Sequence, residues 1–297
     1  MYMRHVPSFF IIGVQKAATS SLHAILSQDT RISLPYRKET HFFSTNYKKG
    51  LNWYLDMFKE DDYVLKGEVD PSYLHYEHSL LNIKKHVKYP KLIIIFRKPI
   101  ERAYSHYLMS KKRNLDDYSF NDALKVENHR LNNDVDNFSF SNHSYILRGE
   151  YSKKVKKCKE VFPNSDYLFL KFEDFVNSKS RINFIKKIYE FLDLEYNDNL
   201  NSDIHLNRSS ILKFDFFNKN LYENNLFKKI GRFLIPSSYY RYKIIRIIEN
   251  LSSVNLPNNI ARLNYSSIDN KFIDWNNEET RKLSSLTGIC FDDWIIK

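Results

Sequence analysis

Cysteine is scarce in this chain: only Cys158 and Cys290 occur among 297 residues. They lie far apart without a paired spacing, which excludes a disulfide framework and a Cys-based zinc site. No run of about 18 apolar residues occurs, so no segment is expected to span a membrane. No cluster of His, Cys and Asp residues has metal-ligand spacing either, and we therefore expect no required metal.

We also expect no secretory leader. Met1–Pro7 shows no charged-then-apolar pattern and runs directly into an apolar segment. The few cysteines agree with a reducing compartment, and the sequence predicts a cytoplasmic protein. No internal repeat or low-complexity segment is visible, and 297 residues with 42% hydrophobic content can bury a large core.

The net charge is +11, which calls for an anionic ligand or partner. Nucleic acid is one interpretation, but the basic residues are spread along the chain and no recognised nucleic-acid module occurs, so we expect no nucleic-acid partner. The basic, aromatic-rich segment 227–251 leaves a peripheral membrane contact open. We favour the alternative, a helix pair whose apolar face packs on the domain.

A loop for an anion is predicted near the start of the chain. The apolar run Phe9–Ile12 ends at Gly13, and Lys16, three hydroxyl residues (Thr19–Ser21) and a helical pattern follow. Strand, turn and helix in this order direct free backbone N–H groups and a helix N-terminus at a phosphate. The order of residues is not that of a Walker A loop, which needs a second glycine followed by Lys and Ser/Thr. The alternative is a helix that is simply capped by Thr or Ser.

A second anion motif follows the apolar run Lys91–Phe96, which suits a strand buried on both faces. Arg97 comes at its carboxyl end, Pro99 suits the first turn of a helix, and Ser105 lies two turns further on. Arg97 and Ser105 together could clamp a second phosphate. The alternative is an ordinary ion pair between Arg97 and Glu101.

Short apolar runs alternate with helical patterns along the chain, which predicts an α/β fold. We expect a P-loop-like parallel sheet flanked by helices on both faces, in a single domain over 1–297. Its core spans 6–195, and 196–297 forms a mostly helical part that covers the binding cleft. Strands are expected at 8–12, 31–34, 63–67, 91–96 and 166–171. Helices are expected at 19–28, 50–58, 78–87, 99–113, 119–131, 143–161, 178–192 and 278–287, with a mobile loop at 132–142.

The two anion motifs, in this order and separation, resemble the PAPS-dependent sulfotransferase family, in particular its heparan-sulfate and bacterial carbohydrate branch. The resemblance implies that the first loop binds the 5′-phosphosulfate of PAPS and that Arg97 and Ser105 bind its 3′-phosphate. Asn207–Ser210 stands where the family often places a loop over the cofactor, which adds Arg208. The implied cofactor-binding residues are Lys16, Ala17, Ala18, Thr19, Ser20, Ser21, Arg97, Ser105 and Arg208.

Further segments extend the resemblance. Lys38–Phe43 looks like the family's segment with the general base, and Gly67–Tyr73 looks like the segment that lines the acceptor cleft. Family members that act on glycosaminoglycans usually carry a lysine within that second segment, where this chain has Val69 and Asp70. Family members in the Golgi carry a membrane anchor, so its absence predicts a bacterial protein. Aromatic residues could stack on sugar rings; the candidates are Trp53, Tyr54, Tyr73 and Tyr76.

The resemblance implies a sulfotransferase that moves a sulfuryl group from PAPS to an acceptor hydroxyl, which we expect on a saccharide or glycolipid. The catalytic residues would be Glu39 as general base, His41 as its orienter or as an alternative base, and Lys16 at the leaving phosphate. Without the resemblance, Glu39 would be interpreted as a surface carboxylate paired with Lys38 or Arg37. Two other classes stay open: a P-loop kinase or NTPase with Asp70 as acidic partner, and a basic membrane- or nucleic-acid-binding protein.

Overall fold

The computed structural model describes residues 5–59, 65–135, 137–204, 210–212, 244, 253–255 and 263–297. These residues fall into two compact units. The first unit comprises Met1–Pro99, Glu150–Leu206 and Trp275–Lys297, and the second comprises Ile100–Gly149 and Asn207–Asp274. Each unit is treated by itself below.

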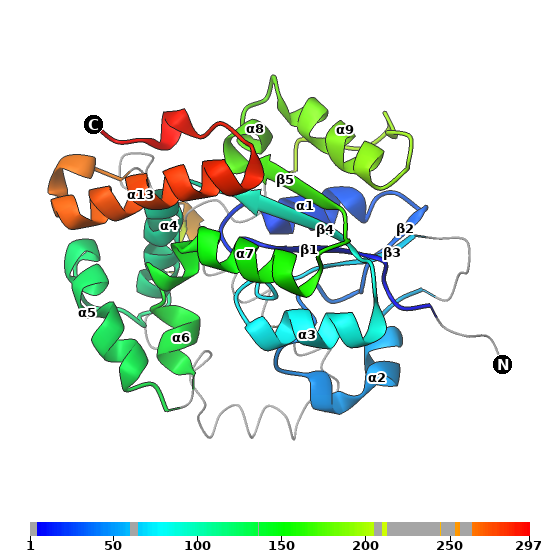
Figure 1. Cartoon of the computed structure of the whole chain (residues 1–297), viewed down its shortest axis with the longest axis horizontal. Helices are drawn as coiled ribbons and strands as arrows, with labels where there is room; N and C mark the ends of the chain where they lie inside the picture. Colours follow the sequence, from blue (N-terminus) through cyan, green and yellow to red (C-terminus); the bar gives the residue numbers. More distant parts are fainter. Residues whose placement is uncertain are drawn as a thin grey trace. The chain divides into compact units, whose positions relative to one another are not determined.

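The first unit is built on a five-stranded sheet in which every neighbouring pair is parallel. The strand order is β2-β3-β1-β4-β5, and the sheet can be followed in Figure 1. The strands are β1 (Phe9–Gly13), β2 (Ile32–Ser33), β3 (Leu65–Val69), β4 (Lys91–Phe96) and β5 (Tyr167–Lys171). This arrangement confirms the predicted α/β fold class with a parallel sheet.

The two most apolar strands lie at the centre of the sheet. All five residues of β1 and all but the first of β4 are buried, as expected for strands covered on both faces. Right-handed crossovers place helices on opposite faces when the chain moves in opposite directions along a sheet. The helix between β1 and β2 therefore lies on one face and those before β4 and β5 on the other (Figure 1). These helices are α1 (Thr19–Leu26), α3 (Glu77–His86) and α7 (Tyr151–Val161).

The remaining elements of the first unit are shorter or lie at its ends. They are η1 (Tyr47–Lys49), α2 (Leu51–Leu55), α8 (Phe172–Val176), α9 (Arg181–Phe191), η4 (Asp292–Trp294) and the C-terminal part of α13 (Asn270–Thr287). Cys158 is buried in the core and Cys290 is exposed, and both are free thiols. The predicted helix 143–161 is wrong in its first turns, because α7 begins only at Tyr151. The backbone amides of Ile146 and Leu147 instead donate to Glu127.

The second unit contains α4 (Pro99–Lys112, of which Pro99 belongs to the first unit), α5 (Phe120–Asn132), α6 (Phe138–Asn142), η2 (Leu147–Gly149) and η3 (Tyr265–Ser267). The predicted loop 132–142 is wrong in its second half. There α6 forms because the chain around it supplies its end contacts: the Asn142 side chain and the Ser144 hydroxyl donate to the carbonyls of Phe138 and Phe140. An antiparallel pair, β6 (Ser210–Leu212) with β7 (Ser253–Asn255), lies in the part expected to be mostly helical.

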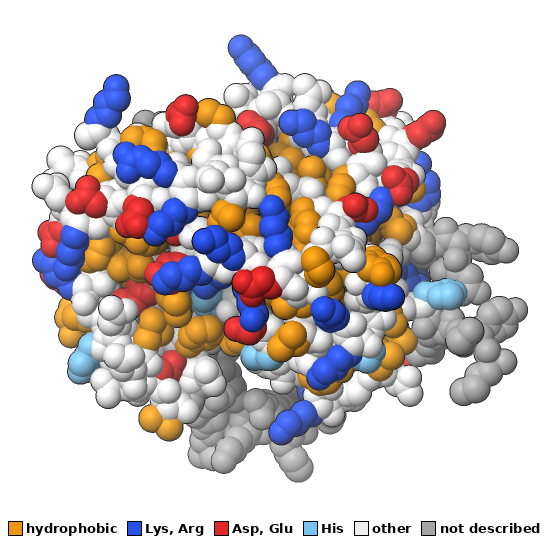
Figure 2. Space-filling view, in the orientation of Figure 1, with side chains coloured by type: hydrophobic (Ala, Val, Ile, Leu, Met, Phe, Trp, Pro, Cys, Tyr) orange, Lys and Arg blue, Asp and Glu red, His pale blue; other side chains and the backbone are white. Residues whose placement is uncertain are grey.

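Charged side chains of both signs are interspersed on the face shown in Figure 2. Lys157 of α7 forms ion pairs with Glu77 of α3 and with Glu160. The basic excess is therefore partly neutralised on these two helices. Among the residues that the structure describes, no helix combines the length and the apolar character needed to cross a membrane. All of segment 227–251 except Ile244 lies outside the described residues.

Candidate active site

The first predicted anion loop connects β1 to α1. Lys16 and Ala18 have left-handed backbones, with φ of 77° and 58°, and α1 begins at Thr19 with Ala18 as its N-cap. No side chain caps the start of this helix with a hydrogen bond, and the first turn contains no acidic residue. The alternative interpretation, a helix capped by Thr or Ser, therefore does not describe this turn. Its N–H groups and helix dipole instead suit an anion.

Arg97 is brought to this loop from the neighbouring strand. It follows β4 directly, and its Nη1 donates a hydrogen bond to the Lys16 carbonyl at 3.1 Å. The guanidinium lies 4.6 Å from the centre of the Phe172 ring, and Tyr151 Oη donates to the Arg97 carbonyl at 2.9 Å. Two motifs that are 81 residues apart in sequence thus meet at the carboxyl ends of β1 and β4.

These two strand ends form the topological switch point of the sheet. From β1 the chain turns to β2 and β3 on one side, whereas β4 and β5 lie on the other side. Parallel α/β sheets bind ligands outside the carboxyl ends of the strands at such a point. The loop with Lys16, Ala17 and Ala18 therefore occupies the position that the fold favours for a ligand.

The other predicted cofactor residues are less fully described. Thr19 and Ser21 are buried and Ser20 is half-buried, all in the first turn of α1. Ser105 lies half-buried on α4, within the second unit. Arg208 lies outside the described residues. The roles proposed for Ser105 and Arg208 stay predictions.

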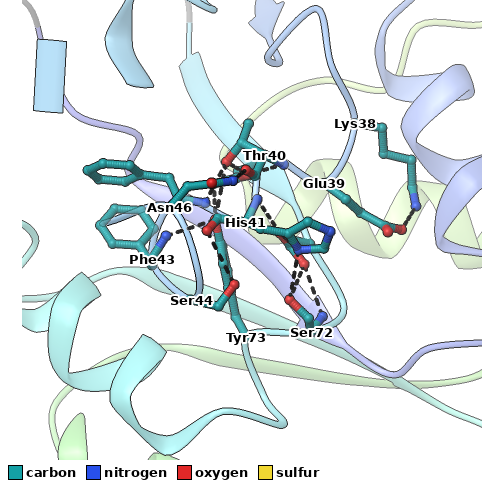
Figure 3. Close-up of polar contacts among 12 residues, drawn as sticks. Lys38, Glu39, Thr40, His41, Phe43, Ser44, Asn46, Ser72 and Tyr73 are labelled. Carbon is teal, nitrogen blue, oxygen red and sulfur yellow. Dashed lines mark hydrogen bonds and ion pairs between the residues drawn. The ribbon is translucent and has the colours of Figure 1, made fainter. Parts of the chain in front are cut away.

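The predicted base lies in the loop that follows β2. Glu39 has a φ of 59°, and about a third of its side chain is exposed. Its carboxylate forms an ion pair with Lys38, the contact that the alternative interpretation expected. Figure 3 shows the Lys38–Glu39 pair beside the imidazole of His41.

His41 is fixed by a buried carboxylate from the end of β3. The His41 N–H and its ring Nδ1 lie 2.9 Å and 3.0 Å from Asp70 Oδ2, and Nδ1 lies 3.2 Å from Ser72 Oγ (Figure 3). Burial disfavours the charged imidazole, but the Asp70 carboxylate outweighs this effect and raises the pKa of His41 to about 9. This raised pKa favours the protonated imidazole, a hydrogen-bond donor, at neutral pH.

A second buried carboxylate, Glu68, holds the same loop from within β3. Thr40 donates to its Oε1 from the hydroxyl at 2.5 Å and from the backbone at 3.2 Å. Tyr54 Oη and Tyr73 Oη donate to its Oε2 at 2.6 and 2.9 Å. Burial and the charge of Asp70 raise the pKa of Glu68, although the hydroxyls of Thr40 and the two tyrosines oppose the shift.

The suggestion that Tyr54 and Tyr73 stack on a sugar is contradicted. Both side chains are fully buried, and the Tyr54 ring stacks on Phe42 with a centroid distance of 4.5 Å. Their hydroxyls serve Glu68, because a buried carboxylate needs hydrogen-bond donors.

Glu68 and Asp70 lie in the segment expected to line the acceptor cleft, and Asp70 was considered as the acidic partner of a kinase or NTPase, but the motifs did not predict that both residues hold the loop with Glu39 and His41. The available signal was the pair of carboxylates two residues apart in a short strand pattern, Gly67–Asp70. Such carboxylates stay buried only when the fold supplies partners. The partners here come from the loop residues Thr40 and His41, about 30 positions earlier.

Fold and site together define a P-loop-like α/β protein whose loop at the switch point has the backbone geometry that suits an anion. The family model for the sulfotransferase domain matches residues 7–232. This chain therefore belongs to the sulfotransferase family, which confirms the family predicted from the sequence.

Several curated proteins are similar to parts of the chain. Mouse (Mus musculus) heparan sulfate glucosamine 3-O-sulfotransferase 3B1 is 30% identical over 196 residues, which cover 65% of this chain and 47% of that protein. The membrane-associated sulfotransferase kil1 of Dictyostelium discoideum is 30% identical over 132 residues, 41% of this chain and 28% of that protein. The chain thus spans about half the length, or less, of these relatives.

A solved structure agrees with the fold. The sulfotransferase from Alicyclobacillus acidocaldarius superimposes with a TM-score of 0.67 at 19% sequence identity, covering 97% of this chain and 98% of that chain. At this identity the likeness concerns the fold alone, and it agrees with the predicted P-loop-like class.

Proposed function

We propose that this protein transfers a sulfuryl group from PAPS to a hydroxyl of a saccharide or glycolipid. Membership of the sulfotransferase family supports the reaction class. The observation that carries the assignment to these residues is the hydrogen bond from Arg97 to the Lys16 carbonyl. It brings the Arg97 guanidinium to the backbone of the Lys16 loop at the switch point, which supports a site for a donor with several phosphate groups.

The described residues fit such a donor. The uncapped first turn of α1 and the left-handed backbone at Lys16 and Ala18 provide N–H groups for the 5′-phosphosulfate. Lys16 adds a point charge there, and Thr19–Ser21 add hydroxyl donors. Arg97 suits the 3′-phosphate, and Ser105 and Arg208 are also proposed to bind the cofactor.

The chemistry follows from these roles. The acceptor oxygen forms a bond to sulfur while the bond from sulfur to the 5′-phosphate oxygen breaks, and adenosine 3′,5′-bisphosphate leaves. The hydroxyl proton passes to Glu39, and Lys16 with the loop amides stabilises the charge on the leaving phosphate. Because the carboxylate of Asp70 raises the pKa of His41, Glu39 suits the role of base better than His41.

The acceptor is proposed from relatives. One is named a heparan sulfate glucosamine 3-O-sulfotransferase, which supports a glycan acceptor for this chain. The cytoplasmic location, the bacterial source, the absence of a metal requirement and of a nucleic-acid partner, and a membrane contact through 227–251 stay predictions.

A kinase-like function is less well supported. It would use Asp70 as an acidic partner for magnesium. Yet both oxygens of this buried carboxylate already accept hydrogen bonds, from His41 and from Ser72. A purely basic binding protein would leave the contact between Arg97 and the Lys16 loop without a purpose.

Incubation of the purified chain with sulfuryl-labelled PAPS and an extract of the producing cell tests the proposal. We expect label in a saccharide or glycolipid with wild type and its near absence with Lys16→Ala. Exposed Lys156 offers a matched control, because Lys156→Ala on α7 removes the same charge away from the loop. Labelling that is equal for wild type and Lys16→Ala would contradict the assignment, and labelling of protein alone would contradict the acceptor class.

A further inference from the structure

Asp70 has an unusual set of contacts for a carboxylate. Its side chain is fully buried immediately after β3. Oδ1 accepts from the Ser72 backbone at 3.0 Å and from the Ser72 hydroxyl at 2.6 Å. Oδ2 accepts from the His41 backbone at 2.9 Å and lies 3.0 Å from His41 Nδ1. Each oxygen is thus bound twice, and the only ionisable group among these partners is His41.

A buried carboxylate is stable as an anion only when a cation or several donors compensate its desolvation. Burial alone would raise the pKa of Asp70, but the charge and hydrogen bond of His41 hold it below its ordinary value. Glu39 also favours the charged imidazole, whereas Arg37 opposes it. The other acidic group that interacts with Asp70 is Glu68, whose pKa is raised by burial and by the charge of Asp70.

The ring orientation assigns different tasks to the two nitrogens of His41. Nδ1 is bound to Asp70 and Ser72. About a third of the side chain is exposed, and Figure 3 shows the other nitrogen on the side of the Lys38–Glu39 pair. A charged imidazole in this position donates from Nε2 toward the proposed base and acceptor, and it cannot accept a proton there.

We propose that Asp70 is a positioning residue that keeps His41 protonated as a hydrogen-bond donor, so that Glu39 is the proton acceptor of the two. The inference rests on the proposed function for its catalytic meaning. The charge state of His41 is independent of it, because it follows from the contacts of Asp70.

NMR of the chain with labelled histidine tests the charge state without turnover, with His41→Asn identifying the signal. We expect both ring nitrogens of His41 to be protonated at pH 7 and to titrate near pH 9. In Asp70→Asn, the charge of Glu39 still opposes burial but the larger effect of Asp70 is lost, and the midpoint should fall by at least about two units. A wild-type midpoint near 6.5 would overturn the proposal even if Asp70→Asn failed to fold.

Glu68→Gln is the matched control, because Glu68 is equally buried two residues earlier but contacts Thr40 rather than His41. In Glu68→Gln, the titration midpoint of His41 should stay above pH 8. A fall as large as in Asp70→Asn would show that general disruption of the loop, and not Asp70 itself, sets the charge.

The pH profile of sulfuryl transfer provides the catalytic readout. Wild type should lose kcat as pH rises through about 9. Asp70→Asn should lose at least about fourfold in kcat at pH 7.5 and regain most of it at pH 6, because the protonated fraction of His41 falls steeply as pH rises above its lowered midpoint. Loss of kcat at all pH values alike would contradict the positioning role. No transfer by any variant, with the NMR result as expected, would count against the proposed function alone.

Discussion

At the scale of single residues, two tasks are assigned to Arg97. Its guanidinium holds the Lys16 carbonyl, and we propose that it also binds the 3′-phosphate. Lys16 itself has a strained left-handed backbone, which costs about 1 kcal/mol in a non-glycine residue. The Arg97 contact helps to hold that conformation, so its loss should affect the loop as well as the ligand.

Ser105→Ala and Arg97→Ala separate these tasks. If Ser105 binds the 3′-phosphate, its variant should weaken binding of adenosine 3′,5′-bisphosphate by about 1.5–3 kcal/mol and leave adenosine 5′-phosphate unchanged. Arg97→Ala should weaken both nucleotides, the bisphosphate more strongly, because the Lys16 loop also loses a contact. Calorimetric titrations that show equal losses for both nucleotides in Ser105→Ala would refute its role.

Removal of the proposed base should act on turnover alone. Glu39→Gln keeps the shape of the side chain, so donor affinity should stay nearly constant while kcat falls roughly 10²–10⁴-fold. Glu77→Gln is the control, since the Glu77 carboxylate likewise forms an ion pair with a lysine. Steady-state kinetics decide the matter: normal turnover in Glu39→Gln together with an inactive His41→Asn would reverse the two roles.

At the scale of elements, β3 shows what a sequence pattern can and cannot predict. The apolar runs of β1 and β4 indicated central strands and located Gly13 and Arg97 at their ends. The partners of Glu68 and Asp70 were not predictable, because hydrophobic periodicity reports apolar burial and is silent about hydrogen bonds from a distant loop. Helix 143–161 was overestimated because Glu127 captures backbone amides that a helix would have used.

Gly67 makes the close packing of β3 on β1 possible. It pairs with Phe9, and a Cβ at this position would lie 2.1 Å from the Phe9 ring. Gly67→Ala should therefore destabilise the chain by about 1–3 kcal/mol. The double variant with Phe9→Leu, measured by urea unfolding, should cost less than the sum of the two single variants. Strict additivity would show that the ring and the new methyl group do not collide.

Glu127 joins α5 to the turn before η2. Its two oxygens accept from the Ile146 and Leu147 amides at 2.7 and 2.8 Å. In Glu127→Gln one of these amides faces an NH₂ group, so unfolding free energy at pH 8 should fall by about 1–3 kcal/mol. Glu160→Gln, at an exposed ion pair, should change it by less than about 1 kcal/mol.

The loss in Glu127→Gln should also depend on pH. Burial raises the pKa of Glu127 to about 7, although the two amides oppose the shift. The proton therefore binds the folded state more tightly than the unfolded state, and wild type loses stability relative to Glu127→Gln as pH rises from about 4.5 to about 7. A stability difference that is constant with pH would contradict a buried, titrating carboxyl group.

At the scale of the whole molecule, the alternation of apolar runs with helical patterns was sufficient to predict the parallel sheet, whereas its strand order and switch point come from the structure. Resemblance supplied the family and the proposed chemistry, which composition and spacing alone could not. The positive charge is spread over the chain and partly paired, so it predicted an anionic ligand without locating its site. The position of the candidate site follows from the topology of the sheet, because parallel strands present their carboxyl ends at one edge.

The central claim is that the switch point binds a 3′,5′-bisphosphate nucleotide. Thermal unfolding with adenosine 3′,5′-bisphosphate, compared with ATP plus magnesium, tests it most directly. A ligand that binds the native state stabilises it, by about 2.7 kcal/mol at a hundred times its Kd. The account predicts a concentration-dependent rise of Tm with adenosine 3′,5′-bisphosphate that Lys16→Ala abolishes. A rise only with ATP plus magnesium would contradict it.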